Sequence, residues 1–248
     1  MSERIGVLAA PVDPVTLDEA AARVIGWARA GESRMICAAN VHMVMEAVDH
    51  PDFARMLADA DLVTPDGMPL AWFLRARGRR GQPRVSGPDL TEELLARAER
   101  AGLPVGFHGS TPAVIEALRA ALAVRHPGLK IAHAESPPFR PLDDAEAARE
   151  AGVIAASGAR LLFVGLGCPK QEAWMHRNRG RIPAAMVGVG AAFEFLAGAR
   201  RRAPAALRRL GLEWLWRLAA EPRRLFARYA RHNGRFAVRA TAALLRGR

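Results

Sequence analysis

Short apolar runs alternate along the chain with longer segments whose apolar residues recur every three or four positions. The runs are short and mostly followed by glycine or a turn residue, which predicts strands over Met35–Ala39, Pro104–His108, Leu129–His133, Leu161–Gly165 and Ala184–Val189. Strands that alternate with helices favour parallel pairing through crossover connections. Residues 1–198 are therefore predicted to form an α/β fold, with a Rossmann-like, mostly parallel sheet and helices on both faces.

Two of the intervening helices have clear start signals. One begins after Ser110 or Thr111, either of which can act as its N-cap, with Pro112 in the first turn. The other runs from about residue 142 to 156, with acidic residues near its start that suit the helix dipole.

Two glycine turns follow predicted strands. Gly165 and Gly167 begin one turn, which continues through Lys170 and Gln171 into a helix, and Gly188 and Gly190 form the other, ahead of Glu194. Free backbone N–H groups at such a turn bind a phosphate or a sugar oxygen, but similar turns also serve only to connect a strand to a helix. Two of them at the carboxyl edge of a sheet favour the binding interpretation.

Polar residues at two further strand ends are ambiguous. Asp66 lies in a Pro-Asp-Gly sequence that is most often a plain turn, yet its carboxylate could take a proton from a substrate hydroxyl. Asn40 could be a helix N-cap or a sugar ligand. Arg84 and the histidines give weaker signals, since His42, His108 and His176 show no metal-ligand spacing.

Charge is concentrated in residues 199–248, which hold fourteen arginines and two acids and carry a net charge of +12, whereas the preceding residues sum to −1. Apolar residues at helical spacing precede Glu221 and Pro222. Arginines then recur at steps of three or four, at positions 224, 228, 231, 235 and 239, beside an apolar stripe of Leu225, Tyr229, Phe236 and Leu244. We interpret residues 199–248 as a basic, amphipathic helical appendage that docks on an anionic membrane surface.

Composition limits the other possibilities. Half of the residues are apolar, which suffices for a sizeable core, and no stretch reaches the ~18 apolar residues that span a bilayer. Cys37 and Cys168 are far apart and indicate neither a disulfide framework nor a zinc site. With no secretory signal in the sequence, we expect a cytosolic protein. No known nucleic-acid-binding motif accompanies the basic segment, so nucleic acid is not an expected partner.

Five ordered segments resemble the WecG/TagA/CpsF family of bacterial glycosyltransferases, glycosyltransferase family 26, over nearly the whole chain. They are Val63–Leu70 (VTPDGMPL), Arg84–Leu90 (RVSGPDL), Val164–Glu172 (VGLGCPKQE), Val187–Phe193 (VGVGAAF) and the tryptophan- and arginine-bearing segment Arg202–Arg224. The resemblance implies an inverting hexosyltransferase that moves a sugar from a UDP-sugar to a sugar on a polyprenyl diphosphate. It also implies a peripheral protein at the cytoplasmic face of the inner membrane, active in surface polysaccharide synthesis.

The same resemblance assigns roles to individual residues. It makes Asp66 the general base and places Arg217, Arg223 and Arg224 of the appendage against the diphosphate. The remaining substrate-binding residues are Asn40 near the sugar, Gln171 and the glycine turns near the nucleotide, and Arg84, Lys170 and Glu194. Many nucleotide-sugar transferases hold a metal through a D-x-D element, and we expect no such element in this chain. We therefore expect metal-independent transfer, with no cofactor.

The chain departs from the family at a few positions. Ala38-Ala39-Asn40 replaces a common Thr-x-Asn, and Phe193-Glu194-Phe195 replaces a frequent Phe-Asp-Phe. These changes leave N-acetylmannosamine, its uronic acid and glucose open as donor sugars. Two other classes of function stay open as well: a membrane-docked, non-catalytic sugar-nucleotide-binding protein, and a basic nucleic-acid-binding adaptor. A homo-oligomer is compatible with all three.

Overall fold

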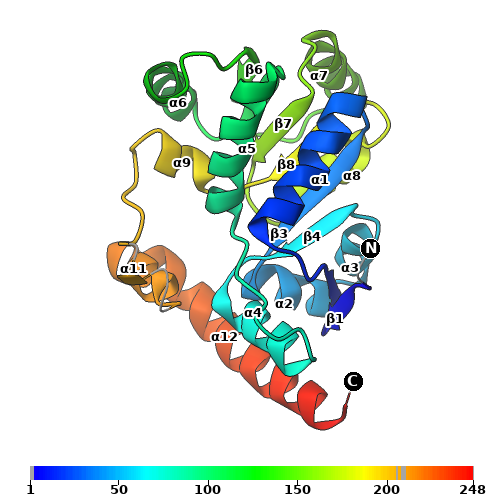
Figure 1. Ribbon diagram of the computed structural model, residues 1–248, viewed down its shortest axis with the longest axis vertical. Helices are drawn as coiled ribbons and strands as arrows, with labels where there is room; N and C mark the ends of the chain where they lie inside the picture. Colours follow the sequence, from blue (N-terminus) through cyan, green and yellow to red (C-terminus); the bar gives the residue numbers. More distant parts are fainter. Residues whose placement is uncertain (1–2, 205, 208–210, 248) are drawn as a thin grey trace.

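A six-stranded parallel sheet forms the centre of the molecule (Figure 1). The computed structural model describes residues 3–204, 206–207 and 211–247, without the side chains of residues 217, 224, 225, 227 and 228. The strands are β3 (Arg34–Ala39), β4 (Leu62–Pro65), β5 (Val105–Gly109), β6 (Ile131–Glu135), β7 (Leu161–Gly165) and β8 (Ala185–Gly188). They lie in the order β4-β3-β8-β7-β5-β6, and every neighbouring pair is parallel. The predicted α/β class is therefore confirmed.

The predicted strand positions agree with the sheet except at β6, which begins two residues later than expected. The amide of Leu129 donates to the carbonyl of His126 in the turn after a helix, so Leu129 is not available to the sheet. A short antiparallel hairpin, β1 (Ile5–Val7) and β2 (Ala10–Val12), was not predicted. Buried Asp13, just after this hairpin, accepts from the amide of Val63 and so attaches the hairpin to β4.

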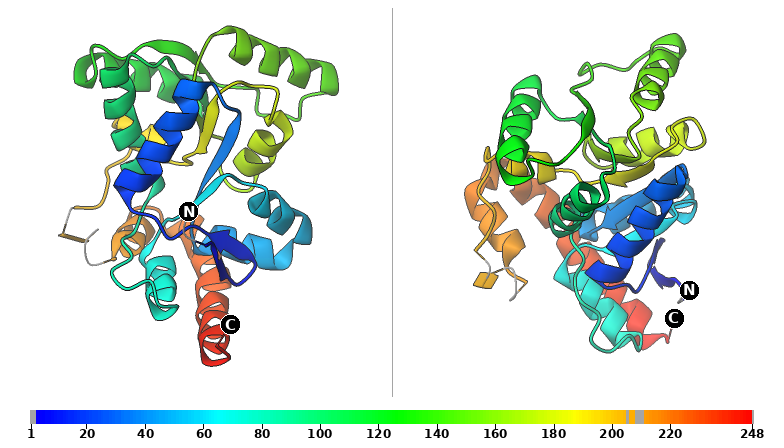
Figure 2. Two further views of the ribbon diagram at one scale, coloured as in Figure 1. Left: turned by 45° about the vertical axis from the view of Figure 1, so that its right-hand side comes forward. Right: turned by 45° about the horizontal axis from the view of Figure 1, so that its top comes forward.

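Helices cover both faces of the sheet, as predicted (Figures 1 and 2). One apolar cluster packs α1 (Leu17–Ala30), α5 (Gly87–Ala101), α6 (Pro112–Arg125) and α9 (Ala192–Leu196) on one face. The other cluster includes α2 (Val41–Asp49), α3 (Pro51–Ala58), α4 (Met68–Ala76), α7 (Asp144–Ala156) and α8 (Lys170–Asn178). Because both faces are buried, the strands are almost continuously apolar.

The predicted helix starts are confirmed. Thr111 caps α6 by accepting from the amide of Val114. Asp143 caps α7 in a reciprocal capping box with Glu146, one residue after the predicted start.

The appendage contains two helices, α11 (Glu213–Ala220) and α12 (Pro222–Leu245), separated at Glu221 as the sequence predicts. Helix α12 packs against α2 and α4 (Figures 1 and 2). Phe236 and Ala240 are buried in the same apolar cluster as α2, and Arg235 makes two hydrogen bonds to Asp49. Phe236 was predicted to face a membrane, and that is wrong: an amphipathic pattern marks a buried face without saying what buries it.

Exposed apolar side chains remain on other faces of the appendage. Phe226, Val238 and Leu245 of α12 and Trp214 and Leu215 of α11 are all exposed. Within the described part of the chain, no helix combines the length and apolarity needed to cross a bilayer.

Candidate active site

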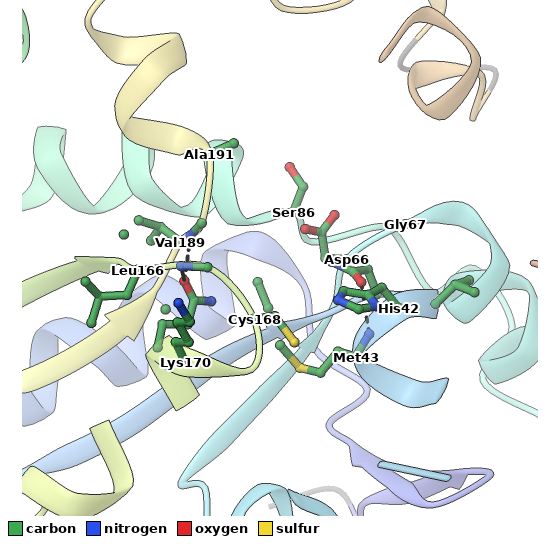
Figure 3. Close-up of a pocket in the computed structure, with 18 of the residues that line it drawn as sticks. His42, Met43, Asp66, Gly67, Ser86, Leu166, Cys168, Lys170, Val189 and Ala191 are labelled. Carbon is green, nitrogen blue, oxygen red and sulfur yellow. Dashed lines mark hydrogen bonds between the residues drawn. The ribbon is translucent and has the colours of Figure 1, made fainter. Parts of the chain in front are cut away.

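A cavity of about 1460 Å³ lies at the carboxyl edge of the sheet. Its walls come from the residues that follow β3, β4, β5, β7 and β8, and from α4, α11 and α12. Asp66, Ser86 and His42 lie on one side of this space, and the Leu166–Lys170 turn and Val189 lie on the other (Figure 3). Parallel strands bring their carboxyl ends to one edge, which is where open α/β sheets bind ligands.

Ten residues predicted to form the site line this one cavity. They are Asn40, Asp66, Arg84, Gly165, Gly167, Lys170, Gln171, Gly188, Gly190 and Glu194. The three remaining predicted residues belong to the appendage. Arg223 is exposed and is not among the lining residues, and the side chains of Arg217 and Arg224 lie outside the described residues.

Gln171 joins the two glycine turns. Its side-chain oxygen accepts from the amides of Gly167, at 3.2 Å, and Gly190, at 3.1 Å, and its amide nitrogen donates to Glu172 at 2.7 Å. Gln171 is almost completely buried. Gln171 was predicted to bind the nucleotide. Its contacts in the structure give it a structural role, which is to fix the spacing between the two turns.

The glycines serve two different purposes. A Cβ on Gly165 would lie 2.9 Å from the ring of Phe193, and one on Gly188 would lie 2.8 Å from the methyl of Met175 and 2.9 Å from Gln171. These two positions need glycine for packing behind the cavity. Gly167 and Gly190 have φ of +79° and +53° with open space beyond them, so they shape the turns that face a ligand.

Buried Glu172, directly after Gln171, is an unusual carboxyl. Burial raises its pKa to about 7, against the opposing hydrogen bond from Gln171. Its second oxygen, Oε2, has no hydrogen-bond partner among the described residues. The carboxyl is thus poised between its charged and neutral forms beneath the first glycine turn.

Asp66 follows β4 and is held at the edge of the sheet by its backbone. Its amide donates to the carbonyl of Ala39 at 2.7 Å, and Gly67 has φ of +111°, which turns the chain away from the strand. The carboxylate accepts from the amide of Gly87 at 3.4 Å. The Asp66 side chain faces the cavity (Figure 3), as general-base chemistry requires.

Asn40 ends the neighbouring strand β3 and caps α2. Its side-chain oxygen accepts from the amide of Met43 at 3.2 Å, so the N-cap interpretation is confirmed. Because Asn40 also lines the cavity, its side-chain NH₂ group is the part that can still reach a substrate.

Arg84 ties the appendage to the body. Its guanidinium donates to Glu213 of α11 at 2.6 Å and to Asp89 of α5 at 3.0 Å, and Asp89 also accepts from Arg202 at 2.6 Å. Burial opposes the charge of Arg84, but Asp66 and Glu213 raise its pKa above the ordinary value. Arg84 therefore stays cationic beside Asp66 while it holds α11 at the mouth of the cavity.

Several further cations face the cavity. They are Arg140, Lys170, Arg177 and Arg200. Arg140 is paired with Glu146, and Arg200 with Glu221. Lys170, at the start of α8 and next to the first glycine turn, makes no hydrogen bond or ion pair to any residue that the structure describes.

A group of aromatic side chains that line the cavity escaped prediction. The rings of His108 and Trp174 stack at 4.6 Å, and the indole N–H of Trp174 donates to Glu150 at 2.7 Å. Exposed Phe139 also lines the cavity, from the proline-rich loop that follows β6. The sequence did offer one signal that His108 belongs to the site. It lies at the end of β5, and other cavity residues also lie at or after strand ends.

His42 contacts His232 of the appendage, a contact that the sequence around His42 does not predict. It lies near Glu46 of the same helix and His232 of α12. By contrast, His176 pairs with Asp59 at the opposite end of the sheet from the cavity.

One Asp-x-Asp triplet, Asp59-Ala60-Asp61, does occur in the chain, and the prediction of metal independence overlooked it. It precedes β4, so it lies at the amino edge of the sheet, whereas Asp66 follows the same strand at the carboxyl edge. Asp61 is engaged there by Arg34, by Arg179 and by the amide of Met35. Neither aspartate lines the cavity, so the triplet is not placed to hold a metal against a diphosphate in it.

Comparison with known proteins identifies a family and a curated relative. The model of the glycosyl transferase WecG/TagA/CpsF family matches residues 5–248. A protein of Bacillus spizizenii, named N-acetylglucosaminyldiphosphoundecaprenol N-acetyl-β-D-mannosaminyltransferase, is 34% identical over 190 residues, which cover 76% of this chain and 72% of that protein. The family match includes the whole sheet and both helices of the appendage.

Proposed function

The chain belongs to the WecG/TagA/CpsF family of glycosyltransferases, and we propose that it transfers N-acetylmannosamine from a UDP-sugar to a sugar on polyprenyl diphosphate, with inversion. The name of the Bacillus relative describes transfer of N-acetylmannosamine to N-acetylglucosaminyldiphosphoundecaprenol. That name favours N-acetylmannosamine over its uronic acid or glucose as the donor sugar, and a polyprenyl-diphosphate-linked N-acetylglucosamine as the acceptor.

The observation that carries this proposal is the convergence of ten predicted residues on one cavity. Ligand pockets commonly measure about 300–1,000 Å³, so a cavity of about 1460 Å³ has room for a donor and an acceptor together. A non-catalytic sugar-nucleotide-binding protein would need the glycine turns but not Asp66 at the same cavity. A nucleic-acid adaptor would need neither.

Asp66 is the proposed general base. An acceptor hydroxyl bound between Asp66 and the glycine turns would pass its proton to the carboxylate as its oxygen attacks the anomeric carbon of the donor. Attack from the side opposite the departing UDP inverts that carbon. The Asn40 NH₂ group, on the adjacent strand, would orient the sugar.

The departing UDP requires positive charge around its diphosphate. Lys170 supplies it from the body, and Arg217, Arg223 and Arg224 would supply more if the appendage closes further over the cavity. In this mechanism no metal takes part in the transfer. Closure would also keep water away from the UDP-sugar.

The appendage, residues 199–248, is also the proposed contact with the membrane. Its exposed apolar side chains are interspersed with exposed Arg231 and Arg239, and exposed Trp72 of neighbouring α4 adds an aromatic anchor. Apolar groups enter the interface while arginines contact anionic headgroups. The proposed site of action is the cytoplasmic face of the inner membrane, where a polyprenyl-diphosphate-linked acceptor would be presented.

The experiment is a donor screen with a short-chain polyprenyl-diphosphate N-acetylglucosamine acceptor. Turnover should be highest with UDP-N-acetylmannosamine. Asp66→Asn should lower kcat by about 10²–10⁴-fold and leave UDP binding intact, since loss of a general base costs about that much. Asp52→Asn, at an exposed position outside the cavity, is the matched control. Wild-type turnover by Asp66→Asn, or no transfer with any UDP-sugar, would contradict the proposal.

A further inference from the structure

Three potential metal ligands meet where the appendage lies on the body. His42 and Glu46 are one turn apart on α2, and His232 comes from α12. One ligand atom from each residue lies within 4.8 Å of the other two. The two imidazole rings are 5.0 Å apart between centroids, and Nδ1 of His42 is 3.7 Å from the Glu46 carboxylate.

Packing between α2 and α12 does not explain why a polar histidine occupies position 232. The residue is 5% exposed, and its Nδ1 has no hydrogen-bond partner among the described residues. An unsatisfied buried polar atom of this kind costs roughly 1–3 kcal/mol, so a missing partner is expected. Arg235, about one turn further along the same helix, is already balanced by Asp49.

The geometry points to a zinc-class transition-metal site, formed by His42, Glu46 and His232, that joins α12 to α2. Two imidazoles and one carboxylate are a ligand set that Zn²⁺ uses, with metal–ligand distances of about 2.0–2.2 Å. Ligand atoms around a tetrahedral ion are then roughly 3.4 Å apart. Small side-chain rotations would bring the three residues to that spacing.

Such a metal would hold the appendage closed. Helix α12 contributes Asn233, Phe236 and Ala237 to the wall of the cavity, so a metal bond to His232 would fix this wall against α2. His42 and His232 also line the cavity, so the proposed ion lies at its wall. This role is separate from the metal-independent chemistry proposed above, because the ion holds a helix and does not contact the diphosphate.

Titration calorimetry on the chelator-treated, untagged full chain tests the site with ZnCl₂ alone. We expect one Zn²⁺ per chain and a higher Tm in its presence. His232→Gln and Glu46→Gln should each weaken Zn²⁺ binding by more than about 100-fold and abolish the rise in Tm, since even loss of an outer-shell partner costs 10–100-fold. Each variant is compared with its own metal-free form, so a change in basal stability does not affect the result.

His50→Gln is the matched control. His50 approaches the same Glu46 carboxylate at 3.6 Å, but it is exposed and outside the cluster. The control should bind Zn²⁺ like the wild type. Hydrogen exchange should slow in α12 when Zn²⁺ is added to the wild type, and not in Glu46→Gln. The inference is overturned if the wild type does not bind Zn²⁺, or if His232→Gln still binds it while His50→Gln does not, because the ion would then sit on α2 alone.

Discussion

Replacing Glu172 by glutamine should remove a large part of the pH dependence of the protein's stability. Burial raises the pKa of this carboxyl from 4.5 to about 7. Between these values the folded protein keeps a proton that the unfolded chain has released. The free energy of unfolding therefore falls as the pH rises through this window. The stabilisation is fully present below pH 4.5 and is lost by about pH 7.

The size of the effect follows from the shift. Each pKa unit corresponds to about 1.4 kcal/mol, so a rise from 4.5 to about 7 gives roughly 3 kcal/mol across the window. Glutamine keeps an oxygen that can accept from Gln171, and it does not titrate. Glu172→Gln should thus be close to the wild type at the acidic end and more stable by roughly 3 kcal/mol at the neutral end.

Urea unfolding at a series of pH values from below 4.5 to above 7 measures this difference. Glu116→Gln, at an exposed position on α6, controls for the removal of one carboxylate from the chain. The prediction concerns the difference between Glu172→Gln and the wild type, so the titration of all other groups cancels. Parallel stability curves for the two proteins across the window would refute the reasoning.

Three other changes test the site and the appendage. Gln171→Leu leaves two turn amides without an acceptor and should lower the free energy of unfolding by about 1–3 kcal/mol for each one that stays buried, measured in urea. Turnover by chelator-treated enzyme should not change when Mg²⁺ or Mn²⁺ is added, and recovery of lost activity by either ion would contradict the role given to lysine and arginine. The double variant Arg231→Glu/Val238→Glu should sediment less with anionic liposomes than the wild type and keep its turnover on a soluble acceptor, and equal sedimentation would contradict membrane docking through α12.

The sheet, and the part of the site that lies at strand ends, could be predicted from the sequence because both depend on local patterns. Short apolar runs ending in glycine identified the strands, and parallel strands must bring their carboxyl ends together. That rule alone predicts that Asp66 and the two glycine turns lie at the same edge of the sheet. The hairpin β1–β2 was missed because strands of three residues are too short to show a period.

The remaining features depend on tertiary contacts that no local pattern contains. Gln171 braces two turns that are neighbours only because β7 and β8 pair. His42 and His232 meet only because α12 returns to pack on α2, so neither sequence neighbourhood contains the pair. The apolar stripe of α12 had the right period, but a helix that packs on a protein and one that lies on a lipid surface look alike in sequence.

The wall that α12 contributes to the cavity has a consequence for how the enzyme is made. This helix leaves the ribosome after the sheet, which is complete once β8 has emerged. Nascent chains fold from the N-terminus as they are synthesised, so the body can be formed before its active site exists. A premature stop codon after residue 198 would then yield a folded but unfinished enzyme, whose cavity lacks the wall that α12 supplies.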